Sequence, residues 1–304
     1  MTHPYRSSKV VILGAGLMGC GIAQVFAHRE IHVTICDPVD SARNAAFSRI
    51  AENLDLLGHD HRALDFISLA KDFKKVTDEA DFVIEAAPEK LAVKQRIFSD
   101  LVSCTPDHCI LASNTSVIPI KDITKGLDGC DRIIGTHWWN PPYLVPLVEV
   151  VQSDQSAPEF VQQMITLLAW IGKKPIHVKK DITGFVANRM QHALWREAIA
   201  LINDGVCDAE TVDIAVKNSF GMRLSVLGPI ENADLVGLDL TQDIHNVVLK
   251  DLCADKKPSP IIQSRIDEGY LGMKTGRGLK KYTNDEIEKV KKGLIDHLRR
   301  VTEL

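Results

Sequence analysis

A carboxylate and an imidazole are placed in the chain where they could transfer a proton. Glu149 interrupts the apolar residues 144–151, and a carboxylate inside such a strand is costly unless a cation or hydrogen-bond donors meet it. His137 follows the strand-like residues 132–136. If the chain turns back between these segments, Glu149 would hold one ring nitrogen and leave the other free to accept a proton. We therefore expect a catalytic His137–Glu149 pair; the alternative is a histidine that only makes a structural hydrogen bond.

Two other polar side chains follow elements that could bring them to the same site. Ser116 comes after a predicted strand, at the carboxyl end where open α/β sheets bind ligands. Its hydroxyl could donate to a substrate oxygen or simply cap the next helix. Asn188 lies near the start of a predicted helix and could reach a substrate across a cleft, or face solvent. His59 and His61 stand in a polar loop without further cysteine or histidine ligands, so we expect no metal site.

The segment Gly14-Ala-Gly16-Leu-Met-Gly19 joins a predicted strand to a predicted helix. The first glycine of such a turn permits a tight bend, the second a close approach of backbone to a pyrophosphate, and the third close packing of helix on strand. Asp37 ends the next predicted strand, where its carboxylate can accept hydrogen bonds from the adenosine ribose. A 2′-phosphate would meet this carboxylate as a like charge, and we expect Arg43 to lie too far away to compensate. The expected cofactor is therefore NAD rather than NADP; a turn without a ligand is the alternative.

An alternation of strands and helices is needed to position these residues, and the first part of the chain supplies one. Strand-like apolar runs alternate with helical patterns up to about residue 184, which indicates a doubly wound α/β sheet. We predict a helical stretch over residues 41–69. After residue 184 the strand pattern fades, so we expect a Rossmann-type NAD-binding domain over residues 1–184 and an all-α C-terminal domain over residues 185–304.

Length and composition are typical of a globular protein. The chain has 304 residues, of which 45% are hydrophobic and 25% charged, so two domains with substantial cores are expected. Lysine and arginine number 36 against 40 aspartate and glutamate. With no basic cluster and no apolar span, we expect a small-molecule partner and neither nucleic acid nor membrane. The seven cysteines form no CxxC pair and no secretion signal is evident, so we expect a cytoplasmic protein without disulfides or zinc.

Over essentially its whole length the chain resembles the L-3-hydroxyacyl-CoA dehydrogenases. The motifs that carry the resemblance stand in family order: Gly14-Ala-Gly16-Leu-Met-Gly19, residues 85–94, Ser113-Asn-Thr-Ser116, His137-Trp-Trp-Asn140-Pro, Leu147-Val-Glu149-Val, Gly184-Phe-Val-Ala-Asn188-Arg, Gly237-Leu-Asp and Lys274-Thr-Gly276-Arg-Gly278. The resemblance implies that His137 is the base with Glu149 behind it. It also implies that Ser116 and Asn188 hold the substrate oxygen, and that the helical domain forms a homodimer. Together with the glycine-rich turn, it implies these NAD contacts: Gly14, Gly16, Leu17, Met18, Gly19, Asp37, Glu89, Lys94, Asn140 and Lys274.

Two segments depart from the acyl-CoA members of the family. Those members carry a lysine-rich helical stretch that resembles a landing site for the CoA phosphates, whereas residues 40–69 here contain three arginines and no lysine. The segment around Arg223 resembles members that oxidise small free carboxylates, such as gulonate 3-dehydrogenase (λ-crystallin) and carnitine dehydrogenase. Arg223 could clamp a substrate carboxylate through two hydrogen bonds, or pair with an acidic residue at a surface. Trp138, Trp139 and Tyr143 could line a pocket for an aromatic or methylammonium group, or only belong to the core.

The sequence thus predicts an NAD-dependent dehydrogenase that oxidises a secondary alcohol at the 3-position of a small free hydroxy acid. His137 would act as the general base, and the substrate would bind in a cleft between the domains. Three alternatives stay open: a short-chain 3-hydroxyacyl-CoA dehydrogenase, for example for 3-hydroxybutyryl-CoA; an enzyme that oxidises an aldehyde on a pyridine-type carboxylate; and a non-catalytic NAD(H)-binding protein with a structural or sensor role.

Overall fold

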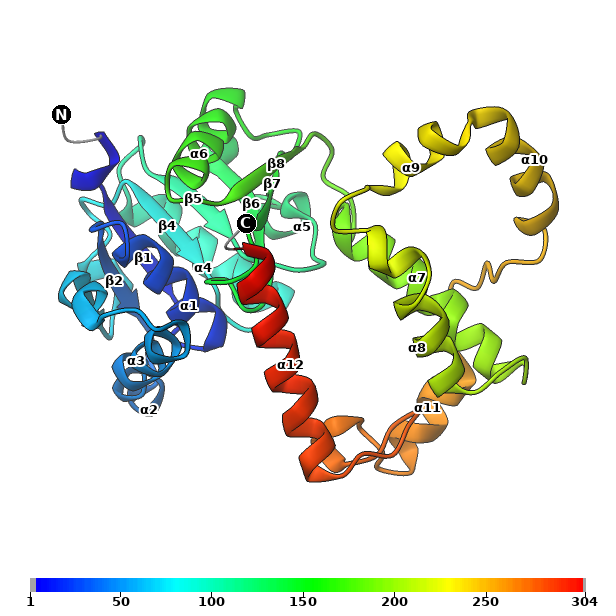
Figure 1. The fold of residues 1–304 in the computed structure, drawn as a ribbon. Helices are drawn as coiled ribbons and strands as arrows, with labels where there is room; N and C mark the ends of the chain where they lie inside the picture. The colour runs from blue at the N-terminus through cyan, green and yellow to red at the C-terminus, as the bar shows by residue number, and fades with distance from the viewer. Residues whose placement is uncertain (1–3, 303–304) are drawn as a thin grey trace. The chain divides into compact units, whose positions relative to one another are not determined.

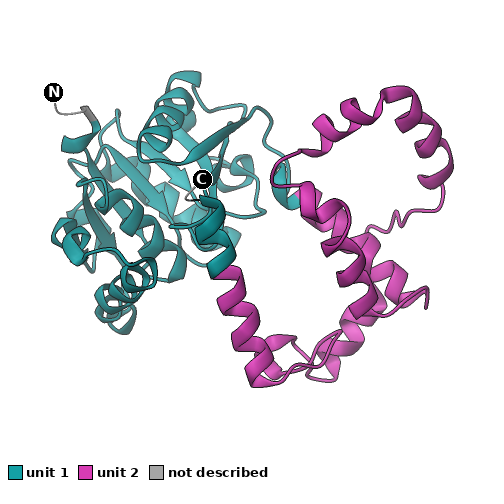
Figure 2. Ribbon diagram, in the orientation of Figure 1, with its two compact units in different colours: residues 1–188, 296–304 teal, residues 189–295 magenta. Residues whose placement is uncertain are grey.

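A computed structural model describes residues 4–302 of the chain. The chain forms two compact units, which Figure 2 distinguishes by colour. Unit 1 comprises residues 1–188 and 296–304, and unit 2 comprises residues 189–295.

Unit 1 is built on an eight-stranded sheet in the order β3-β2-β1-β4-β5-β6-β7-β8 (Figure 1). β6 and β7 are antiparallel, and all other neighbours are parallel. The strands are β1 (Lys9–Leu13), β2 (His32–Cys36), β3 (Ile67–Ala70), β4 (Phe82–Glu85), β5 (Ile110–Ser113), β6 (Ile133–Trp138), β7 (Leu147–Val151) and β8 (Lys174–Val178). The strand order reverses between β1 and β4, and ligands of open α/β sheets bind at such a switch point.

Helices cover both faces of this sheet, as the predicted doubly wound fold requires. They are α1 (Leu17–Ala27), α2 (Asp40–Asn44), α3 (Ala46–Leu57), α4 (Leu91–Cys104), α5 (Ile120–Ile123) and α6 (Pro158–Trp170). Alternate residues of β1 point to opposite faces. Val10 and Ile12 join an apolar cluster with α1, α3 and α6, whereas Val11 and Leu13 join a second cluster with α4 and α5. The strands are buried on both sides, which explains their continuous apolar sequences.

The prediction of one helical stretch over residues 41–69 is wrong in its last part. α3 ends at Leu57 because Gly58 adopts a left-handed conformation with φ of 69°. Asp60 then caps a 3₁₀ turn, η2 (His61–Phe66), and β3 adds a strand beside β2. A four-residue edge strand is too short for its alternation to stand out against the helical pattern before it.

Unit 2 is helical, as predicted for the C-terminal part of the chain. The helices of the C-terminal region are α7 (Ala187–Asn203), α8 (Ala209–Lys217), α9 (Pro229–Val236), α10 (Leu238–Val248), α11 (Pro260–Asp267) and α12 (Asn284–Thr302). The first two residues of α7 and the end of α12 belong to unit 1. Outside the named strands, residues 4–302 add only isolated β-bridges, which join Arg277 to Gly272 and to Lys281. No helix within residues 4–302 is long and apolar enough to cross a membrane.

Candidate active site

His137 and Glu149 meet across the antiparallel pair β6 and β7, where they occupy directly opposed positions. Nδ1 of His137 lies 2.7 Å from Oε2 of Glu149, and both side chains are buried. The second carboxylate oxygen, Oε1, accepts hydrogen bonds from the backbone N–H groups of Val186 and Ala187, at 2.9 and 3.0 Å, where α7 begins. Burial alone would raise the pKa of Glu149, but the bonds from His137 and the two backbone groups outweigh it and hold the pKa below its usual value.

The ionised carboxylate decides which nitrogen of His137 carries a proton. A carboxylate only accepts hydrogen bonds, so Nδ1 is the protonated nitrogen and Nε2 keeps a free lone pair. This tautomer follows from the hydrogen-bond pattern. A neutral imidazole held in this way can take a proton at Nε2, and Glu149 then stabilises the imidazolium that forms.

Trp138, Trp139 and Tyr143, the aromatic residues predicted to line a pocket, have different environments. The ring of Trp139 lies 5.3 Å from the imidazole, centroid to centroid. Trp138 points into the core instead, where it contacts Phe26 and lies beneath the Lys173 ammonium. Tyr143 lies against Gly21 of α1. Of the two tryptophans, only Trp139 is beside the base.

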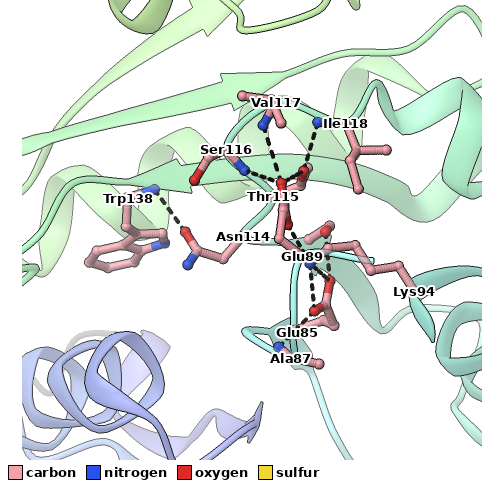
Figure 3. Close-up of polar contacts among 11 residues, drawn as sticks. Glu85, Ala87, Glu89, Lys94, Asn114, Thr115, Ser116, Val117, Ile118 and Trp138 are labelled. Atoms are coloured by element: carbon pink, nitrogen blue, oxygen red, sulfur yellow. Dashed lines mark hydrogen bonds and ion pairs between the residues drawn. The ribbon is translucent and has the colours of Figure 1, made fainter. Parts of the chain in front are cut away.

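Ser116 and Asn188 are brought together through a backbone group. Nδ2 of Asn188 donates to the Ser116 carbonyl at 2.8 Å, and Asn188 is buried directly after the two residues that bind Glu149. The Ser116 residue itself is exposed. The same loop is tied to the end of β6, because the Trp138 N–H donates to Oδ1 of Asn114 at 3.0 Å (Figure 3). That Ser116 and Asn188 hold a substrate oxygen stays a prediction.

Glu89 holds the loop that carries Ser116 (Figure 3). Its Oε1 accepts hydrogen bonds from the Thr115 hydroxyl at 2.6 Å and from the Ser116 N–H at 2.9 Å. Lys94 pairs with the other oxygen at 3.1 Å. Burial alone would raise the pKa of Glu89, but the bonds from Thr115 and Ser116 and the charge of Lys94 hold it below its usual value. Glu89 and Lys94 therefore shape this loop, and their predicted contact with NAD stays a prediction.

Glu85 is a member of this network to which the sequence analysis assigned no role. It ends β4, is fully buried, and receives the Lys94 ammonium at 2.8 and 3.0 Å from its two oxygens. The Ser113 hydroxyl and the Ala87 N–H donate to the same carboxylate, at 2.6 and 2.7 Å. The signal that could have found it is the one that found Glu149, a carboxylate in an apolar strand that needs a partner.

The glycine-rich turn fits a dinucleotide. A Cβ on Gly14, whose φ is 113°, would lie 2.6 Å from the Ala86 carbonyl oxygen, and one on Gly19 would lie 1.8 Å from the Gly14 carbonyl oxygen. Gly16 instead faces open space, with no atom within 4 Å of such a Cβ. The first backbone hydrogen bond of α1 runs from Cys20 to Gly16, so the N–H groups of residues 17–19 precede the helical ladder and are available to an anion. The turn therefore provides both the space and the hydrogen-bond donors that a pyrophosphate needs. The donors include the backbone N–H groups of Leu17 and Met18.

Asp37 lies beside this turn with both carboxylate oxygens engaged by backbone. The N–H groups of Ala15 and Val39 each donate to it at 2.8 Å. Arg43 lies closer to this position than expected, because its Nη1 donates to the Asp37 carbonyl at 2.6 Å; that it does not compensate the charge of a 2′-phosphate stays a prediction. α2 begins at Asp40, soon enough for the Arg43 side chain to reach back over one turn.

Three other predicted residues are exposed. Asn140 is exposed just after β6. Lys274 and Arg223 belong to unit 2, where they are exposed in the 3₁₀ turns η6 (Met273–Thr275) and η5 (Phe220–Arg223). The contacts of Asn140 and Lys274 with NAD, and of Arg223 with substrate, stay predictions.

A Rossmann-type sheet with a dinucleotide turn and a buried histidine–carboxylate pair defines an NAD-dependent oxidoreductase. The NAD-binding domain family of 3-hydroxyacyl-CoA dehydrogenase matches residues 9–182, and the C-terminal domain family of the same enzymes matches residues 184–282. The chain belongs to the 3-hydroxyacyl-CoA dehydrogenase family and is an NAD-dependent oxidoreductase that acts on CH–OH groups.

Relatives within the family carry different substrate names. The chain is 32% identical to 5-formyl-3-hydroxy-2-methylpyridine 4-carboxylate 5-dehydrogenase of Mesorhizobium japonicum, over 92% of each chain. It is 33% identical to a probable 3-hydroxybutyryl-CoA dehydrogenase of Bacillus subtilis, over 90% of this chain and 97% of that one. It is also 33% identical to L-carnitine dehydrogenase of Streptomyces coelicolor, over 78% and 76%. A crystal structure of the pyridine carboxylate dehydrogenase, described as an NAD+-dependent dismutase, superposes with a TM-score of 0.90 at 30% identity, over 97% of both chains.

Proposed function

We propose that this protein oxidises the alcohol group of a small free hydroxy carboxylate, with His137 as general base. The observation that carries the proposal is the His137–Glu149 pair, whose geometry leaves Nε2 of His137 as the free proton acceptor. Bound NAD supplies the hydride acceptor. His137 would take the proton from the hydroxyl oxygen while the hydride leaves the carbon that bears this hydroxyl, and Glu149 would stabilise the imidazolium that forms. Ser116 and Asn188 orient the substrate oxygen.

The cations available near the nucleotide site favour a small substrate over a CoA ester. Residues 40–69 contain three arginines and no lysine. Two of these arginines already have partners within unit 1. Arg43 binds the Asp37 carbonyl and Asp40, and Arg49 donates to the Ala15 carbonyl at 2.7 Å. The same segment carries Glu52, Asp55, Asp60 and Asp65 besides Asp40, so it offers no net positive charge to CoA phosphates. Two of the named relatives act on free acids, in agreement with this proposal.

Arg223 is the proposed anchor for the substrate carboxylate. A guanidinium can bind a carboxylate through two parallel hydrogen bonds, which would orient a substrate that has no CoA group to hold. The test is NADH formation by the purified protein against free hydroxy carboxylates and, in parallel, 3-hydroxyacyl-CoA esters. Activity confined to the free acids, with a KM that rises in Arg223→Met, supports the proposal. Strong activity on the CoA esters would instead select the short-chain 3-hydroxyacyl-CoA dehydrogenase.

A second candidate is oxidation of an aldehyde on a pyridine-type carboxylate, favoured by the TM-score of 0.90 with the pyridine carboxylate dehydrogenase. The hydrate of an aldehyde carries a C–H and an O–H on one carbon, so His137 can remove the proton while hydride leaves, and the product is a carboxylic acid. Including formylpyridine carboxylates in the substrate panel separates this reaction from alcohol oxidation.

We also propose that the protein is a cytoplasmic homodimer. Unit 2 exposes large apolar side chains, among them Val226 at 87%, Ile230 at 73% and Leu235 at 73%, and a second copy would bury such a surface. All seven cysteines are free thiols, which suits a reducing compartment. The mass in solution, measured by light scattering after gel filtration, tests the dimer; a monomer at micromolar concentration would contradict it.

A further inference from the structure

The carboxylate of Asp37 is held rigidly at the tip of β2. Both of its oxygens accept backbone hydrogen bonds, from Ala15 in the glycine-rich turn and from Val39. In a dinucleotide fold this position faces the adenosine ribose. A 2′-phosphate at that position would meet a fixed negative charge.

Two cations lie close to the end of β2, and a second acidic residue, Asp40, pairs with both. Nη2 of Arg43 lies 2.5 Å from Oδ1 of Asp40, while Nη1 of the same guanidinium donates to the Asp37 carbonyl. Nζ of Lys71 lies 3.9 Å from the same Asp40 oxygen. Lys71 is there because it follows β3, the strand paired with β2, and because the Asp37 N–H donates to the carbonyl of Ala70.

In this cluster a carboxylate already pairs with the two cations that could bind a phosphate. Arginine and lysine side chains beside a ribose are the groups that bind a 2′-phosphate. Here the hydrogen bond from Arg43 and the charges of Lys71 and Arg43 hold the pKa of Asp40 below its usual value, so Asp40 is ionised at neutral pH. Asp40 thus occupies the place that the phosphate charge would take.

We propose that Asp40 is a second determinant of cofactor selection, which masks a latent 2′-phosphate site formed by Arg43 and Lys71. Asp37 repels the 2′-phosphate, and Asp40 neutralises the charge of the two neighbouring cations by pairing with them. Removing Asp37 alone leaves Arg43 tied to Asp40. Removing both carboxylates frees Arg43 and Lys71, so the two substitutions act more than additively on NADPH binding.

The experiment compares Asp37→Ser, Asp40→Asn and the double variant. The dissociation constants of NADH and NADPH are measured from energy transfer between tryptophan and the bound nicotinamide, and that of adenosine 2′,5′-bisphosphate by calorimetry. We expect Asp40→Asn to leave NADPH excluded, and the double variant to bind NADPH and the bisphosphate at least about tenfold more tightly than Asp37→Ser does. Adding Arg43→Met to the double variant should remove that gain.

The matched control is Asp37→Ser with Asp55→Asn. Asp55 is an exposed residue of α3 that pairs with His61, so this variant makes the same change in net charge without touching Arg43. It should bind NADPH as Asp37→Ser does. An equal gain in this control, or no gain in the Asp37/Asp40 double variant, would overturn the proposal. Should the serine variants unfold, the same series with Asp37→Asn tests the proposal, because asparagine keeps the size of the side chain and an acceptor oxygen for one of the two N–H groups.

Discussion

The imidazole of His137 and the carboxylate of Glu149 are in direct cross-strand register on β6 and β7, with Nδ1 and Oε2 2.7 Å apart. The remaining carboxylate oxygen is bound by two backbone N–H groups at the start of α7. The orientation of the base therefore depends on β6, β7 and the backbone of residues 186–187.

Replacing His137 with glutamine tests its role as general base. Because glutamine cannot take up a proton, we expect kcat to fall by about 10²–10⁴-fold, while the dissociation constant of NADH changes little. Steady-state kinetics and an NADH titration of the same sample measure the two quantities. Turnover close to that of the wild type would contradict the assignment.

The lowered pKa of Glu149 makes its contribution to stability depend on pH. Its folded pKa lies below the usual value of 4.5, so the contribution is fully present above the unfolded pKa and is lost as the pH falls through the folded pKa. In urea unfolding, the stability difference between wild type and Glu149→Gln should therefore be largest near pH 7 and shrink below about pH 4.5. A difference that stays constant between pH 3 and pH 7 would show that the carboxylate charge is not what stabilises the fold.

The buried pair Glu85–Lys94 predicts a non-additive pattern. Lys94→Met leaves the Glu85 carboxylate buried without its cation, which we expect to cost about 3–5 kcal/mol of unfolding free energy. Glu85→Gln/Lys94→Met removes the buried unpaired charge. The amide oxygen can still accept from the Ala87 N–H, and the amide nitrogen can donate to the Ser113 hydroxyl, so the double variant should be more stable than Lys94→Met. Chemical denaturation of the variants measures the coupling. Simple additivity would argue against a direct pair.

Two glycines of the nucleotide turn should respond differently to alanine. Gly19→Ala places a methyl group on the Gly14 carbonyl and should lower the thermal midpoint strongly or prevent folding. Gly16→Ala meets open space and should leave the thermal midpoint nearly unchanged, but it should weaken NADH binding because the methyl group obstructs the pyrophosphate. Unchanged NADH affinity in Gly16→Ala would place the dinucleotide elsewhere.

Local sequence patterns were sufficient to predict the glycine-rich turn and the place of Asp37 beside it. The turn from Gly14 to Gly19 and the carboxylate at Asp37 depend on backbone constraints within one βαβ unit. Such constraints can be recognised from the residue types of a short segment. Glu149 could also be found, because a carboxylate in an apolar strand requires a partner wherever the strand lies.

Other features depended on how distant segments pack. Glu85, Lys94 and Ser113 come from β4, α4 and β5, and their contact arises only because parallel strands bring their carboxyl ends to one edge of the sheet. The link from Asn188 to Ser116 joins residues 72 positions apart and uses a carbonyl, a group that every residue carries. The sequence alone thus determined the cofactor turn and the candidate base. The tertiary structure decided which charges are paired. The energy of a charge pair depends on the distance between the charges, and this distance is set by how distant segments pack, which local propensity does not determine.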